Sequence, residues 1–289
     1  LKRWPDTKYR DWYLGDWLAP MGVDAGNQAS VDLVSNCFIS ECLSTMYKTA
    51  ITLGKREEAE EFAIRREKLN KLIHQTFYRA DEGIYSTGSQ LDMCYPMLVG
   101  VVPDSLYNKV KENVVAMTEE KYKGHIAVGL VGVPILTEWA VRNKQVDFFY
   151  QMMKKRDYPG YLYMIDHGAT ATWEYWSGER SRVHNCYNGI GTWFYQAVGG
   201  IRLDEANSGY RHFYVDPQTP NGVTWAKVTK ESPYGTIAVN WKLKDDNQLN
   251  LQLTVPAGTT ATVCIPNNAV SCKKNKKKVS VKEQTVDVE

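Results

Sequence analysis

The stretch VSNCFISECLSTMYKTAITLG, residues 34–54, is followed at once by KREEAEEFAIRREKLNKLIHQTF, residues 55–77. In the first stretch apolar residues recur at steps of three and four, the period of one face of an α-helix, and Gly54 is a natural stop. In the second stretch an acidic first turn suits the positive end of a helix dipole, and apolar residues again share one side. Two helices joined by so short a break predict an antiparallel helical hairpin.

The helical pattern continues to about residue 200. Loops that carry glycine, proline and many of the aromatic residues interrupt it. Further helices are expected near residues 90–100, 104–120, 126–142, 145–155 and 184–199. The first part of the chain is therefore predicted to be an array of helical hairpins.

The pattern changes after the pair Gly199 and Gly200. Apolar and polar residues then alternate between turn residues, which is typical of antiparallel strands, in VTWAKVT (223–229), GTIAVNWKLK (235–244), QLNLQLTV (248–255) and TATVCIP (260–266). We therefore expect two domains, a helical domain over residues 1–201 and a β-sandwich over residues 202–289. The fold class is a multidomain α+β protein.

Composition excludes several classes of function. The chain has 289 residues, 43% of them hydrophobic and 24% charged, which is typical of a folded protein large enough for two domains. The formal net charge of +2 does not predict a nucleic-acid partner, and no run of 18 uncharged apolar residues predicts membrane insertion. The six cysteines lack zinc-site spacing, so no metal is expected, and they leave the compartment open, with the periplasm or the extracellular space favoured over the cytoplasm.

The segment HGATATWEYWSGE, residues 167–179, concentrates the residue types that carry chemistry. Glu174 lies among Trp173, Tyr175 and Trp176, and a carboxylate that is partly desolvated by aromatic rings can accept a proton near neutrality. Composition leaves two interpretations open, a general base or a glutamate that caps the next helix. Trp173 and Trp176 are candidates for sugar contact because flat rings stack on apolar sugar faces.

Two further segments carry candidate binding residues. The turn YLGDWLAP, residues 13–20, pairs Asp16, a hydroxyl acceptor, with Trp17, a stacking surface; an Asx-type turn with a buried Trp17 is the structural alternative. In RVHNCYNGIGTWFY, residues 182–195, His184 precedes a predicted helix that would direct it into a cavity, although a lone histidine is more often structural. Phosphate-loop, dinucleotide, GxSxG and HExxH motifs do not occur, so we expect a cofactor-free hydrolase.

Over nearly all its length the sequence resembles glycoside hydrolase family 78, the α-L-rhamnosidases. The resemblance is carried by ordered motifs that keep their spacing: GDW (15–17), GHIAVGLVG (124–132), YPGYLYM (158–164), GATATWEYW (168–176) and HNCYNGIGTWFYQAVGGI (184–201). It implies an (α/α)6 toroid of six helical hairpins, partial in this chain, followed by a C-terminal β-sandwich. The helix-then-strand order agrees with that implication.

The resemblance also implies an activity, the inverting removal of terminal α-L-rhamnose from glycans or glycosides. The family pattern around the base is close to GATTIWERW, so Glu174 takes the position of the base, while Tyr175 replaces a basic residue. His184 matches a histidine that contacts substrate, although the residue before it has become Val183. Asp16, Trp17, Trp173, Trp176 and His184 are the expected substrate-binding residues.

An inverting hydrolase needs a second carboxyl group, the general acid. The family segment that carries it resembles DCPQRDERLGWTGD, and residues 1–14 do not match it. Seven or eight expected helices also fall short of the twelve of a closed toroid. We therefore expect this chain to be part of a longer protein whose upstream portion completes the toroid, and to be inactive alone.

Two alternative functions are compatible with the same residues. The first is another (α/α) toroid enzyme, either a different glycosidase or a polysaccharide lyase. The lyase would need a Tyr/His or Tyr/Arg site for a uronic acid, whereas this loop offers a carboxylate. The second is a catalytically inactive toroid that binds glycans, which would also lack the acid. An intact acid segment upstream of residue 1 would distinguish the enzyme from the binder.

Overall fold

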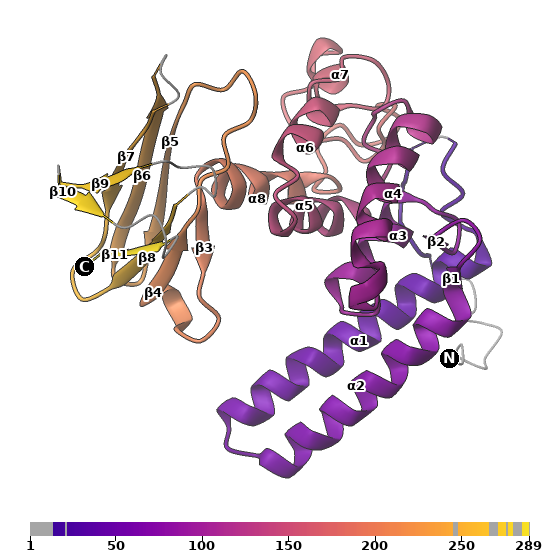
Figure 1. Ribbon diagram of the computed structural model, residues 1–289. Coiled ribbons are helices and arrows are strands. Elements are labelled where there is room, and N and C mark those ends of the chain that lie inside the picture. Colours follow the sequence, from indigo (N-terminus) through magenta and orange to yellow (C-terminus); the bar gives the residue numbers. More distant parts are fainter. Residues whose placement is uncertain are drawn as a thin grey trace. The chain divides into compact units, whose positions relative to one another are not determined.

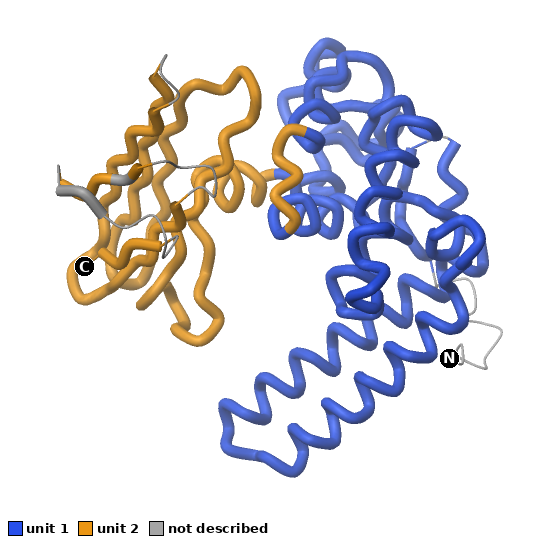
Figure 2. The backbone as a smooth tube through the Cα atoms, in the orientation of Figure 1, with its two compact units in different colours: residues 1–142, 148–190 blue, residues 143–147, 191–289 orange. Residues whose placement is uncertain are grey.

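The computed structural model describes residues 14–20, 22–244, 248–265, 271–275, 277–279 and 285–288. The chain forms two compact units (Figure 2). Unit 1 takes Leu1–Arg142 and Phe148–Ile190, and unit 2 takes Asn143–Asp147 and Gly191–Glu289. Residues 191–201, expected in the helical domain, belong to unit 2. The domain limits 1–201 and 202–289 stay a prediction.

A long antiparallel hairpin opens unit 1, with α1 over Gln28–Thr52 and α2 over Arg56–Phe77 (Figure 1). The Asn27 side chain accepts the Ala29 N–H at the start of α1, and Glu57 and Glu58 supply the acidic first turn of α2. The first part of α1 is buried through Val31, Leu33, Val34 and Cys37. The predicted helical hairpin is confirmed.

The rest of unit 1 packs shorter helices around a buried centre. They are α3 (Gln90–Leu98), α4 (Asp104–Tyr122), α5 (Gly132–Arg142), α6 (Val146–Met153) and α7 (Tyr161–Asp166), with a small hairpin of β1 (Tyr78–Arg79) and β2 (Ile84–Tyr85) before α3. Helix α3 is buried over most of its length and contacts both α4 and α5. Of the helices in the described residues, none combines the length and the apolar character needed to cross a membrane.

Two predicted helices are shorter than expected. Residues 126–131 are not helical, because the Gly129 and Gly132 N–H groups bond to the Asp16 carboxylate rather than within a helix. Residues 184–187 are not helical either, since the His184 N–H bonds to the Thr172 carbonyl. The chain then forms three short turns, η2 (Asn188–Ile190), α8 (Gly191–Trp193) and a π-helix, η3 (Phe194–Val198).

Unit 2 holds two larger sheets and a short hairpin. The four-stranded sheet has the order β11 (Thr285–Val288), β8 (Thr260–Cys264), β4 (His212–Val215), β3 (Ile201–Leu203), and a 3-10 turn, η4 (Ser208–Tyr210), lies between β3 and β4. The three-stranded sheet has the order β5 (Trp225–Ser232), β6 (Gly235–Leu243), β7 (Leu249–Thr254). The short hairpin pairs β9 (Cys272–Lys274) with β10 (Lys277–Val279).

Both larger sheets contribute buried residues to the core of unit 2, among them Phe213 and Val215 in β4 and Val239 and Trp241 in β6. The Trp241 Nε1–H donates to the Val198 carbonyl at 2.7 Å, which ties the π-helix to this core. One pair departs from the expected antiparallel pattern, because β4 and β8 are parallel. The whole β5–β7 sheet lies between β4 and β8 in sequence, and a connection of this length allows β8 to run parallel to β4.

Residues 143–147, which link α5 to α6 and include the first two residues of α6, belong to unit 2. The Asp147 carboxylate accepts both the backbone N–H of Asn221 at 2.6 Å and its side-chain N–H at 2.9 Å. Lys144 forms an ion pair with Asp216 at 3.2 Å, and Arg202 pairs with the same carboxylate. The segment is thus held in unit 2 by side-chain contacts.

Candidate active site

The predicted turn at residues 14–20 is anchored through Asp16. Its Oδ2 accepts the Gly129 N–H at 2.6 Å and its Oδ1 accepts the Gly132 N–H at 2.8 Å, and the side chain is buried. Burial raises the pKa of Asp16 to about 6, and these backbone hydrogen bonds oppose the rise. Asp16 therefore fastens two loops together and does not present its carboxylate at the surface.

The second loop, residues 124–131, approaches this turn closely. The Leu130 N–H donates to the Trp17 carbonyl at 2.7 Å. A Cβ atom on Gly129 would lie 2.1 Å from the same carbonyl oxygen, so only glycine fits at this position. The motifs GDW and GHIAVGLVG are thus two halves of one contact.

The aromatic loop of residues 167–190 packs onto this pair of loops through Trp176 and Tyr187. The buried Trp176 ring stacks on Tyr187 at 4.1 Å between centroids, and its Nε1–H donates to the Val128 carbonyl at 2.9 Å. The Tyr187 hydroxyl lies 2.9 Å from the Leu18 carbonyl and 3.2 Å from the Glu174 carbonyl. Tyr187 therefore links the three segments.

Trp173 is also buried, beneath the loop that follows it. The guanidinium carbon of Arg182 lies 5.2 Å from its ring centroid, and Arg182 Nε donates to the Gly178 carbonyl at 3.3 Å. Gly178 has a φ of +82°, and a Cβ atom there would lie 2.7 Å from the Trp173 ring. This tryptophan supports the loop from below.

Glu174 lies between the two buried tryptophans, and its side chain is 19% exposed. Its backbone N–H donates to the Ser181 carbonyl at 2.9 Å, and the Ser181 N–H donates to Glu174 Oε2 at 3.3 Å. The Nη1 atom of Arg180 lies 3.9 Å from Glu174 Oε1. The carboxylate thus keeps access to solvent while its backbone and one oxygen are held.

His184 is fixed at both its backbone and its ring. Its N–H donates to the Thr172 carbonyl at 2.8 Å, and the Thr172 hydroxyl donates to the His184 carbonyl. The Cys186 N–H donates to His184 Nδ1 at 3.0 Å. Because Nδ1 acts as the acceptor, the neutral ring carries its proton on Nε2. His184 therefore presents a half-buried N–H donor at Nε2.

The structure therefore brings five of the six predicted site residues into one network of unit 1: Asp16, Trp173, Glu174, Trp176 and His184. Trp17 joins it through its backbone carbonyl, and its side chain is 40% exposed. Direct sugar contact by Asp16, Trp173 and Trp176 is not supported by their burial, because protein atoms already cover them.

Sequence reasoning assigned no role to Tyr187, Cys186 or Arg180. Tyr187 is buried in the centre of the network, and the buried Cys186 thiol has its pKa raised to about 11 by burial, with the charges of Glu174 and Asp16 adding to the rise. The motif HNCYNG contains two of these residues, so their positions were visible but their partners were not. Arg180 had no signal, because an isolated arginine in a loop is ordinary.

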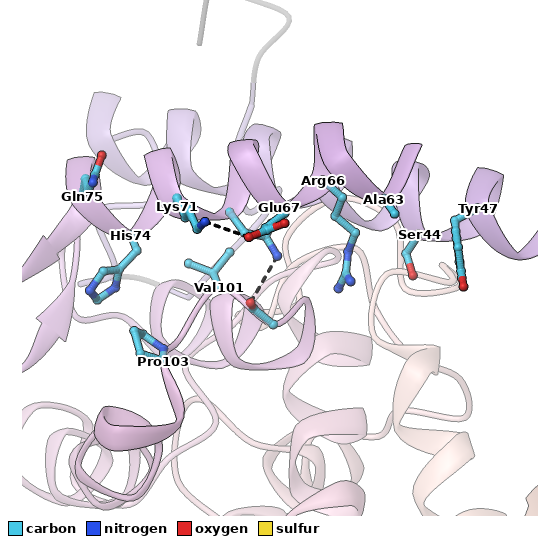
Figure 3. Close-up of a pocket in the computed structure, with 12 residues that line it drawn as sticks. Ser44, Tyr47, Ala63, Arg66, Glu67, Lys71, His74, Gln75, Val101 and Pro103 are labelled. Atoms are coloured by element: carbon cyan, nitrogen blue, oxygen red, sulfur yellow. Dashed lines mark hydrogen bonds and ion pairs between the residues drawn. The ribbon is translucent and has the colours of Figure 1, made fainter. Parts of the chain in front are cut away.

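A separate cavity of about 540 Å³ lies between α1, α2 and residues 100–103 (Figure 3). Arg66, Lys71 and His74 of α2 border it, and none of the predicted site residues lines it. Arg66 Nη2 donates to the Val99 carbonyl at 2.6 Å, and Lys71 pairs with Glu67. Within the part of the chain that the structure describes, no group of three or more His, Cys, Asp or Glu side chains is placed to hold a metal ion.

The chain matches two known family models. Residues 1–198 match the bacterial alpha-L-rhamnosidase 6 hairpin glycosidase domain, and residues 200–280 match the bacterial alpha-L-rhamnosidase C-terminal domain. The helical unit with its carboxylate-bearing aromatic loop is thus of the class of hairpin-built glycosidase domains. The chain belongs to the bacterial α-L-rhamnosidase family, as its motifs predicted.

Two curated relatives illustrate the similarity. An alpha-L-rhamnosidase of Formosa agariphila is 29% identical over 269 residues, covering 88% of this chain and 28% of the relative. One from an Alteromonas species is 26% identical over 270 residues, covering 87% of this chain and 29% of the relative. The chain thus spans less than a third of the length of either relative.

Solved structures show the same fold. The alpha-L-rhamnosidase of Streptomyces avermitilis, complexed with L-rhamnose, has a TM-score of 0.79 at 24% identity and covers 91% of this chain and 26% of that one. The enzyme of Dictyoglumus thermophilum has a TM-score of 0.84 at 20% identity, covering 95% and 32%. The expected helical hairpin domain followed by a β-rich domain is confirmed.

Proposed function

We propose that the complete protein containing this chain is an inverting α-L-rhamnosidase that removes terminal α-L-rhamnose, and that Glu174 is its general base. The observation that carries the proposal is the environment of Glu174. Its carboxylate is partly open to solvent, yet its backbone and one oxygen are held by Ser181. A base must be oriented and must also reach a water molecule, and this arrangement meets both needs.

The chemistry follows from two carboxyl groups on opposite sides of the sugar. Glu174 removes a proton from water, whose oxygen forms a bond to the anomeric carbon from one face. The general acid gives its proton to the glycosidic oxygen as that bond breaks on the other face. The two carboxyl groups of an inverting site lie about 6.5–9.5 Å apart, which leaves room for the water.

His184 and Trp17 are proposed to contact the sugar directly. The Nε2–H of His184 is a donor whose ring is fixed through Nδ1, and Trp17 offers an exposed ring. We assign Asp16, Trp173 and Trp176 to positioning instead. They hold the loops that carry Glu174 and Trp17, because their polar atoms bond to backbone groups or their rings are covered.

The general acid and the remaining hairpins are proposed to lie on an upstream part of the same protein. One helix face supports this proposal. Ile39, Cys42, Met46 and Leu53 follow one another at steps of three, four and seven along α1 and its C-cap, and all four are exposed. We call this set the α1 apolar stripe. Its spacing suits packing against another antiparallel helix.

The test is Glu174→Gln in the complete protein, assayed on an aryl α-L-rhamnoside. Glutamine keeps the shape but cannot take a proton, so kcat should fall by about 10²–10⁴-fold with KM little changed. Inversion is read from the anomer released first, by NMR. Residues 1–289 expressed alone should show no turnover.

Glu179→Gln is the matched control, because Glu179 is an exposed acid in the same loop. Its kcat should stay within about two-fold of the wild type. Near-normal activity of Glu174→Gln would remove Glu174 from the role of base. A complete protein that binds rhamnosides but never cleaves them would instead favour the glycan-binding alternative.

A further inference from the structure

The loop from Glu174 to Ser181 has one backbone hydrogen bond that joins its ends and a second one inside it. The Glu174 N–H bonds to the Ser181 carbonyl, and the Gly178 N–H bonds to the Tyr175 carbonyl inside the loop. Arg180, which immediately precedes Ser181, has a φ of +56°, a left-handed conformation that is uncommon for arginine. The backbone conformation therefore fixes the position from which the Arg180 side chain extends.

The Arg180 guanidinium has two neighbours. Its Nη1 atom lies 3.9 Å from Glu174 Oε1, and its carbon lies 5.4 Å from the centroid of the Tyr175 ring. A cation over an aromatic face is attracted by the ring, so Tyr175 gives the guanidinium a second support beside the carboxylate. The side chain is 66% exposed, which makes the ion pair modest and sensitive to salt.

The other charged and titratable groups around Glu174 do not supply a second cation. Arg182 is directed away, over Trp173 and onto the Gly178 carbonyl. Asp16, from the packed turn, and Cys186, in the same aromatic loop, carry no positive charge. His184 receives the Cys186 N–H, Tyr187 bonds to the Glu174 carbonyl, and Glu179 is exposed. Among the described residues, Arg180 is thus the cation that forms an ion pair with Glu174.

We propose that Arg180 is a positioning residue of the active site: packed against Tyr175, it holds the Glu174 carboxylate in the orientation that accepts a proton from water. This inference rests on the proposed role of Glu174. It also gives Tyr175 a role, because the aromatic ring at this position packs against the guanidinium of Arg180, five residues further along the chain.

The first test is Arg180→Gln in the complete protein, with kcat and KM measured separately. Without the cation the carboxylate is held less firmly, so kcat should fall by about three-fold, the size expected of an exposed ion pair. KM should stay within about two-fold of the wild type, because Arg180 is not proposed to contact the sugar.

Three comparisons sharpen this test. Arg180→Lys keeps a charge and should recover most of the lost kcat. The double variant Tyr175→Arg with Arg180→Gln moves the guanidinium to position 175 and should also recover it. Raising the salt concentration should lower kcat in the wild type but not in Arg180→Gln, because only the wild type has the ion pair for salt to screen.

The Glu174 carboxyl can also be followed by ¹³C NMR in glutamate-labelled complete protein, with its signal identified by loss in Glu174→Gln. At one fixed pH, its chemical shift should differ between the wild type and Arg180→Gln, whether or not the protein turns over substrate, because only the wild type has the ion pair. The same chemical shift in both proteins, with kcat unchanged, would overturn the inference and leave the role of Glu174 standing. Full activity of Glu174→Gln would reject the proposed function, while the chemical shift would still decide whether Arg180 acts on the carboxylate.

Discussion

Two regions of unit 1 use their side chains in opposite ways. Around Asp16 and Tyr187, polar groups from segments far apart in the sequence bond to one another, and large rings such as Trp176 are buried. Along α1 (Figure 1), the residues of the α1 apolar stripe are exposed, with Met46 46% and Leu53 64% exposed. The polar groups of the first region are bonded within the chain, whereas the second region is suited to a further packing partner.

Of the changes considered, Asp16→Ala should have the largest effect on stability, and it acts on the region around Asp16 and Tyr187. It leaves the Gly129 and Gly132 N–H groups buried without their acceptor, at a cost on the order of 4 kcal/mol. Amide hydrogen exchange should show lost protection at both glycines in the complete protein. Unchanged protection would mean that the two loops hold together without Asp16.

The pH dependence of stability that arises from Asp16 should be somewhat smaller than the effect of Asp16→Ala. The folded-state pKa of Asp16, about 6, lies above the ordinary value of 3.8 for an aspartate, so the folded state binds more protons between these values. Stability from this group is therefore present below pH 4 and is lost as the pH rises to 6, by up to about 3 kcal/mol.

Asp16→Asn, which does not titrate, is the reference for that prediction. The difference in unfolding free energy between wild type and variant should fall from pH 4 to pH 6 and stay level above pH 7. A difference that stays flat, or rises, would show that the backbone hydrogen bonds outweigh the cost of burying the charge.

The α1 apolar stripe should give the smallest effect, and one that depends on context. Met46→Glu adds a charge to an exposed face, so residues 1–289 alone should change by less than about 0.5 kcal/mol. In the complete protein the same change should cost about 2 kcal/mol if a helix covers the stripe. Apparent Tm is the measurement, and Thr45→Glu, at an exposed polar position of the same helix, is the control.

How well the sequence predicted each feature depends on how far apart in the sequence the interacting residues lie. The hairpin of α1 and α2 is specified by local periodicity and a glycine stop, and it was predicted without error in kind. GHIAVGLVG has a helix-like apolar pattern, but Asp16, 113 residues before Gly129, captures the amide that a helix would need. The parallel pairing of β4 with β8 was missed for the same reason.

The candidate site divides along similar lines. The aromatic composition around Glu174 was visible, and the ordered motifs indicated a role for that residue. Burial of Trp173 and Trp176 could not be predicted, because a loop has no periodicity that separates covered rings from open ones. The position of Arg180 depends on a left-handed backbone and on Tyr175, which no local pattern announces.

The assignment of residues 143–147 to unit 2 has a consequence for how this protein can be divided. The polypeptide enters unit 2, returns to unit 1 for α6, α7 and the aromatic loop, and then enters unit 2 again. A single cut in the chain cannot yield both units intact, because a cut at residue 190 removes the partners of Asp147 and Lys144. A segment cut out as residues 191–289 would therefore lack a part of the β-rich unit, so the two units are best expressed and engineered together.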